Sequence, residues 1–106
     1  MADEERRSSR RARFEGWVGI AAGDAHRMAR ARDLSARGIG LTLGGAHPFT
    51  AGVVESEFAL PGFVVPLKLS AHVAWADERT QGLGLRFEEI DPGLEELLEN
   101  YVAGRL

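Results

Sequence analysis

Two short clusters of polar residues hold the side chains in this sequence that could do chemistry. Residues 6–11, RRSSRR, contain the spacing RxxxR in two registers, Arg6 with Arg10 and Arg7 with Arg11. Residues 33–38, DLSARG, have the pattern DxSxxG. A guanidinium group can bind a phosphate or a guanine edge through two parallel hydrogen bonds, and it can stack on a ring. The first cluster therefore indicates a site for an anion.

Charge is distributed unevenly along the chain. The formal net charge is −3, yet residues 1–37 contain nine Arg against six acidic residues, and residues 38–106 contain four bases against ten acids. The basic first third is where an anionic ligand is expected to bind.

Composition argues against several kinds of site. The chain has no cysteine, so it has no disulfide, no thiolate nucleophile and no thiolate-based metal site. His26, His47 and His72 lie on three separate predicted elements without a carboxylate at ligand spacing, and we expect no metal and no cofactor. No Ser-His-Asp order and no glycine-rich phosphate loop with a lysine can be assembled, so an enzyme is not expected.

Alternation of apolar residues predicts six short strands without an intervening helix. Turn-forming runs such as residues 22–24 (AGD) and 61–62 (PG) separate them, and the return strand over residues 26–32 is the most polar. The residues expected to face inward are Phe14, Gly16, Val18, Ile20, Ile39, Leu41, Leu43, Val54, Ser56, Phe58, Leu60, Leu67, Leu69, Val73, Trp75, Leu83, Leu85 and Phe87. Phe49 and Phe63, beside loop turns, are also expected to pack in the core. The series predicts an antiparallel barrel or sandwich.

The last fifteen or so residues change to helical periodicity. Asp91 is a good N-cap, Pro92 suits the first helical position, and Gly104 is a plausible stop. The apolar face of this helix should cover one open end or side of the strands, with Glu95, Glu96 and Glu99 in water.

The chain is expected to fold as one domain with an arm. With 106 residues and 44% apolar content, it can bury a single core. Residues 1–13 are polar and rich in Arg, which predicts a flexible amino-terminal arm, and residues 14–106 form the folded domain. No apolar run is long enough to span a bilayer, so we expect a cytoplasmic protein without membrane insertion.

An RxxxR arm, a DxSxxG motif that begins 22 residues after Arg11, four further strands and a final helix resemble the PilZ domain family of bacterial cyclic di-GMP receptors. The segments LPGFVVPLKLSAHVAW (60–75) and GLGLRF (82–87) add to this resemblance, which covers essentially the whole chain. It implies a mainly β fold, a six-stranded antiparallel β-barrel with a C-terminal α-helix.

The resemblance also implies that the chain binds cyclic di-GMP between the arm and one face of the barrel. Arg7 and Arg11 would form the clamp, with Arg6 and Arg10 as the alternative register. Asp33 would accept hydrogen bonds from guanine N1–H and N2–H, Ser35 would donate to a phosphate or base acceptor, and Gly38 would permit close backbone approach. The signal would pass to an unidentified effector protein that controls motility, exopolysaccharide secretion or pilus assembly.

Other interpretations stay open. Asp33 and Ser35 could simply close a turn before Ile39. The chain could also be a PilZ-like protein adaptor that binds no nucleotide, because the bulky Arg37 could extend into the site or block it. A nucleic-acid polymer is not an expected partner, since the barrel and helix are acidic and no aromatic residues interleave with the arginines. A monomer or weak dimer is expected.

Overall fold

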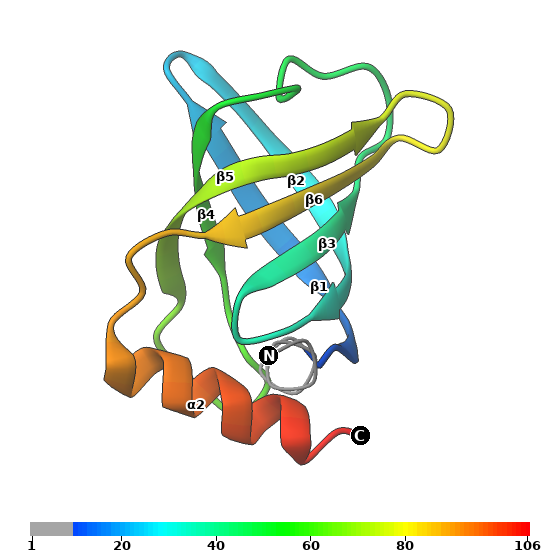
Figure 1. Ribbon diagram of the computed structural model, residues 1–106. Coiled ribbons are helices and arrows are strands. Elements are labelled where there is room, and N and C mark those ends of the chain that lie inside the picture. The colour runs from blue at the N-terminus through cyan, green and yellow to red at the C-terminus, as the bar shows by residue number, and fades with distance from the viewer. Residues whose placement is uncertain (1–9) are drawn as a thin grey trace, which may run out of the picture.

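The computed structural model describes residues 10–106, which form six strands and a helix. These elements are β1 (Ala12–Ala22), β2 (Ala25–Leu34), β3 (Gly38–Thr42), β4 (Val53–Phe58), β5 (Leu67–Asp77), β6 (Gly82–Phe87) and α2 (Pro92–Ala103). The strands are antiparallel and close into a barrel in the order β1-β2-β3-β6-β5-β4, and α2 lies across one end (Figure 1). The predicted β-barrel with a C-terminal helix is confirmed.

Apolar residues at alternate positions fill the inside of this barrel, as predicted. The fully buried side chains include Val18 and Ile20 of β1, Ile39 and Leu41 of β3, and Leu83 of β6. At the end of the barrel that α2 covers, the aromatic rings meet edge to face, with Phe14 6.0 Å from Phe58 and 6.2 Å from Tyr101 between ring centroids. One core therefore joins the barrel to the helix.

The first strand begins earlier than the sequence predicts. β1 starts at Ala12, two residues before Phe14, and Ala12 is buried. Arg11 therefore directly precedes a strand instead of lying within a longer arm. Arg6 and Arg7 lie outside the described residues.

Two β-bulges turn the side chains of Asp33 and Trp75 to the outside of the barrel. Between β2 and β3 the register passes from Ala31 opposite Leu41 to Asp33 opposite Gly40, which leaves Arg32 as the extra residue. An extra residue reverses the face on which the following side chains lie. Asp33 therefore points outward although it is two residues from the buried Ala31.

The second bulge corrects the prediction that Trp75 belongs to the core. Val73 pairs with Leu85, but Trp75 pairs with Gly84, so Ala74 is the extra residue. The indole of Trp75 therefore lies on the outer surface with 44% of its area exposed. The prediction for Phe63 was also wrong, because its side chain is 45% exposed, whereas Phe49 is buried as expected.

Helix α2 begins and ends where the sequence predicts. The Asp91 side chain accepts hydrogen bonds from the backbone N–H groups of Gly93 (3.0 Å) and Leu94 (3.3 Å), Pro92 is the first helical residue, and Gly104 caps the other end. Leu98 and Val102 are buried against the barrel. Among residues 10–106, no helix combines the length and apolar character needed to cross a membrane.

Substitution of the helix cap gives a first test of this arrangement. Asp91→Ala removes the acceptor for two backbone donors, so we expect it to lower the free energy of unfolding by about 1 kcal/mol. Asp91→Asn keeps a capping oxygen and should stay within a few tenths of a kcal/mol of the wild type. Urea unfolding followed by circular dichroism measures both, and equal losses for the two variants would contradict the capping role.

Candidate functional site

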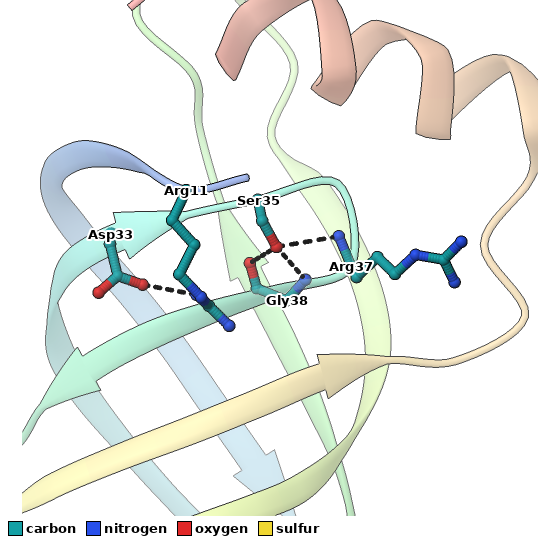
Figure 2. A network of polar contacts seen from close by, with 5 residues as sticks. All are labelled: Arg11, Asp33, Ser35, Arg37 and Gly38. Carbon is teal, nitrogen blue, oxygen red and sulfur yellow. Dashed lines mark hydrogen bonds and ion pairs between the residues drawn. The ribbon is translucent and has the colours of Figure 1, made fainter. Parts of the chain in front are cut away.

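The DxSxxG residues form a tight turn between β2 and β3, held by the Ser35 hydroxyl. Ser35 Oγ accepts hydrogen bonds from the backbone N–H groups of Arg37 and Gly38, both at 3.1 Å, and donates to the Gly38 carbonyl at 3.4 Å (Figure 2). The backbone N–H of Ser35 donates to the same carbonyl at 2.9 Å. The Ser35 side chain is 1% exposed. Its observed contacts are therefore those of the turn.

Gly38 brings this turn against the neighbouring strand. A Cβ atom at Gly38 would lie 2.2 Å from the backbone oxygen of Leu85 on β6. No side chain fits at that distance, so glycine is required for the close pairing of β3 with β6. The turn is also hydrogen-bonded to β6, because the Arg37 carbonyl accepts a hydrogen bond from the Phe87 N–H at 2.7 Å.

Arg11 and Asp33 form an ion pair on the outer surface beside the turn. Arg11 Nη1 lies 2.6 Å from Asp33 Oδ1, and the two side chains are 46% and 30% exposed. The carboxylate rests on Gly40, where a Cβ atom would lie 2.7 Å from Asp33 Oδ1. Because both partners are partly in water, the pair contributes at most about 1 kcal/mol to stability. The structure thus brings together one residue of the RxxxR cluster and the first residue of DxSxxG.

A cavity of about 370 Å³ opens next to this ion pair. It is lined by Arg11, Ser35, Arg37, Ala74, Trp75, Gly84, Leu85 and Arg86. The indole lies against Gly82 and Gly84 of β6, since a Cβ at Gly84 would be 2.1 Å from Trp75 Nε1 and a Cβ at Gly82 would be 3.0 Å from Trp75 Cζ3. A bulge that turns the ring outward and a glycine that makes room for it therefore give the cavity an aromatic wall.

The cavity is suited to a planar, anionic ligand. Its lining residues include three arginines and no Asp or Glu. Arginine forks bind phosphate oxygens or a purine edge through paired hydrogen bonds, and an indole face offers a stacking surface of about 1–3 kcal/mol per base. In Figure 2 the Arg37 side chain extends away from Ser35 and Asp33, so it borders the cavity without covering the Arg11–Asp33 pair.

Three cavity residues were missed in the sequence analysis as parts of the site. Arg37 was considered as a possible obstruction, Trp75 was assigned to the core, and Arg86 was not singled out. A usable signal was present in Gly82-Leu83-Gly84-Leu85, because glycines at the outward positions of a strand leave room for a large ring from the next strand. Arg10 is exposed, and within residues 10–106 its side chain makes no hydrogen bond.

Residues 10–106 contain no group of three His, Cys, Asp or Glu side chains placed to hold a metal ion. The imidazole of His72 contacts the Glu88 carboxylate on the outside of the barrel through its Nε2 atom.

The fold and the cavity define a small β-barrel domain with an arginine-lined, aromatic-walled hollow on its outer surface. A family model described as PilZ domain matches residues 5–104, nearly the whole chain. The chain belongs to the PilZ domain family. Among curated proteins, no match was found.

Solved structures share this fold at low sequence identity. The inhibitor of motility MotI/DgrA from Bacillus subtilis superposes with a TM-score of 0.76 at 20% identity, over 94% of this chain and 50% of that chain. This chain thus spans half the length of that protein. The PilZ domain of YcgR from Escherichia coli with c-di-GMP gives 0.68 at 19%, over 94% and 91%. The PilZ domain of CeSA from a cellulose-synthesizing bacterium gives 0.68 at 20%, over 91% and 97%.

Proposed function

We propose that this PilZ domain is a cyclic di-GMP receptor without catalytic activity, which relays nucleotide binding to an effector protein. The observation that carries the proposal is the cavity lined by Trp75 and by three arginines, Arg11, Arg37 and Arg86. Two of the similar solved structures, both of YcgR from Escherichia coli, contain c-di-GMP, and a third is an inhibitor of motility. Control of motility, exopolysaccharide secretion or pilus assembly is the corresponding output.

Each cavity residue has a role that follows from its chemistry. The Trp75 ring would stack on a guanine base. Guanine O6 and N7 form a paired acceptor that fits an arginine fork, and the two phosphates require cations, so Arg11, Arg37 and Arg86 would divide these tasks. Arg7 is proposed as the second arginine of the clamp, with Arg6 and Arg10 as the other register. Ser35 and Gly38 stabilise the turn that positions Arg37.

The Arg11–Asp33 ion pair is the resting state of the clamp in this proposal. Asp33 Oδ1 accepts from Arg11 in the free protein, and guanine N1–H and N2–H would replace that donor when the ligand binds. Arg11 would then turn its fork to the base or to a phosphate. Because the pair is partly exposed and contributes little to stability, the exchange costs the receptor little.

Titration calorimetry with cyclic di-GMP tests the receptor. The wild type is expected to bind, and Arg11→Ala and Asp33→Ala should each weaken binding by about ten- to a hundredfold, the loss typical of a charged hydrogen bond. Ser35→Ala is the less specific variant, because its hydroxyl supports the turn and its loss would also lower stability.

Arg79→Ala is the matched control for charge. Arg79 lies in the turn between β5 and β6, outside the cavity lining, and its substitution removes the same charge as Arg11→Ala. Equal, salt-dependent losses for Arg79→Ala and Arg11→Ala would indicate nonspecific anion binding. If neither calorimetry nor a competition assay detected binding of cyclic di-GMP to the wild type, the second candidate would be favoured. That candidate is a PilZ adaptor that binds its effector without the nucleotide.

A further inference from the structure

Three consecutive apolar residues project from the barrel in the connection between β4 and β5. Phe63, Val64 and Val65 are 45%, 96% and 73% exposed, and Pro61 and Pro66 flank them. Single exposed apolar residues are common on protein surfaces, but contiguous exposed patches mark interaction sites. We name residues 63–65 the apolar tip.

The apolar tip is held in place on both sides. Leu60 is buried, and its carbonyl accepts a hydrogen bond from the Phe63 N–H at 3.0 Å across the turn formed by Pro61 and Gly62. Gly62 has φ +88°, the left-handed value that the third residue of a type II turn requires. On the other side the chain enters β5 at Leu67. The tip is thus presented by a defined turn, which lowers the entropy cost of binding a partner.

A groove lies between the apolar tip and helix α2. The connection that contains the tip descends from the barrel to α2 (Figure 1). The groove has a volume of about 450 Å³ and is lined by Phe63, Gly93, Glu96, Leu97, Asn100 and Tyr101. The α2 residues in this set recur every three or four positions, so they form one stripe of the helix. We name the tip and this stripe together the tip–helix groove.

The charge around the groove determines what can bind there. Helix α2 contains Glu95, Glu96 and Glu99 and no basic residue, and its last turn has no cation to offset the negative end of the helix dipole. The one basic residue that follows the helix, Arg105, lies over the Tyr101 ring at 4.9 Å. An acidic rim repels anionic lipids and acidic proteins, and it attracts a partner with basic residues around an apolar stripe.

We propose that the tip–helix groove is the docking surface for a basic amphipathic helix of the effector protein. The apolar stripe of that helix would lie on the apolar tip and Leu97, and its Lys or Arg residues would face Glu96 and Glu99, the mode in which helices bind grooves. This inference rests on the relay step of the proposed function. It does not depend on the nucleotide site, because the groove and the arginine-lined cavity share no lining residue.

Nuclear magnetic resonance titration with a model peptide tests the proposal. The probe is an amphipathic helical peptide made of Leu and Lys, compared with a peptide of the same pattern in which Glu replaces Lys. We expect amide shifts of residues 62–65 and 93–101 with the Leu/Lys peptide and none with the Leu/Glu peptide. Equal binding of both peptides, or shifts centred on another acidic surface such as Glu55 and Glu57 of β4, would overturn the proposal.

A pair of valine substitutions locates the contact. Val64→Ser should weaken binding of the Leu/Lys peptide about tenfold, because the apolar contact that the peptide would bury against Val64 is lost. Val53→Ser, at an exposed valine on the outer face of β4, should leave it unchanged. Unchanged affinity of Val64→Ser would overturn the proposal. Self-association of the wild type, or binding to neutral lipid vesicles, that Val64→Ser removes would also overturn it, in favour of a second copy or a membrane.

Titration with cyclic di-GMP distinguishes failure of the docking surface from failure of the proposed receptor function. Val64→Ser is expected to bind cyclic di-GMP as the wild type does. If the wild type binds the Leu/Lys peptide in the tip–helix groove but not the nucleotide, the docking surface stands and the receptor does not. If the wild type binds the nucleotide but not the peptide, the receptor function stands and the docking surface does not.

Discussion

Trp75→Ala is expected to weaken cyclic di-GMP binding by about five- to a hundredfold and to leave the chain folded. Stacking of a base on an aromatic ring contributes about 1–3 kcal/mol, and Trp75 is the aromatic residue that lines the cavity. Its ring lies outside the barrel, so its removal creates no void in the inner core. Calorimetric titration measures the affinity, and circular dichroism checks the fold.

Two further variants separate stacking from a general disturbance of the surface. The sequence has two tryptophans, so Trp17→Phe leaves Trp75 as the sole indole, whose fluorescence should be quenched by the nucleotide. Gly84→Ala retains the indole but places a Cβ where Trp75 Nε1 now lies, and it should weaken binding in the same direction. Unchanged Trp75 fluorescence at saturating nucleotide would rule out the stacking role.

Gly38→Ala is expected to lower the free energy of unfolding by about 1–3 kcal/mol. The new methyl group would meet the Leu85 backbone oxygen at 2.2 Å, and a backbone atom within a closed barrel cannot move aside without separating β3 from β6. Overpacking of this kind typically costs 1–3 kcal/mol. Urea unfolding of the purified variant measures the loss.

Gly44→Ala provides the control for this glycine. Gly44 lies in the loop after β3, and a Cβ there would meet no atom within 4 Å. Its substitution should leave stability unchanged or raise it by up to about 1 kcal/mol, because alanine restricts the unfolded chain. If both variants lost the same stability, backbone propensity would explain the effect and the close strand approach would not.

Alternation along the chain was enough to predict six strands in an antiparallel barrel or sandwich, because inward residues such as Val18 and Leu41 must be apolar and their neighbours need not be. The choice of the barrel came from the family resemblance. The helix could be predicted from the change to helical periodicity after residue 91, together with Asp91 as N-cap and Pro92 at the first helical position. The positions that could not be predicted follow bulges. One extra residue, Ala74, reverses the face of Trp75, and the alternation along β5 itself does not reveal it. The signal lay on the neighbouring strand, in Gly82 and Gly84.

The candidate site, like the fold, could be predicted only in part from the sequence. Arg11, Asp33 and Ser35 could be singled out from their motifs, and the structure places the first two in contact. Arg86 could not, because an arginine at an outward strand position looks like any solvated charge until the neighbouring strand is known. Trp75, Arg86 and Arg37 come from three separate elements, and their meeting is a property of the barrel order that pairs β6 with both β3 and β5.

The barrel is closed, but not along the full length of every strand. Each described strand is hydrogen-bonded to two neighbours, yet β1 pairs with β4 only through residues 18–21, and β2 pairs with β3 only through residues 30–34. Residues 12–17 of β1 and 25–29 of β2 therefore have a strand neighbour on one side only. Strand edges without a neighbour are where chains add to one another, so these two stretches are where edge-to-edge aggregation of the barrel would begin.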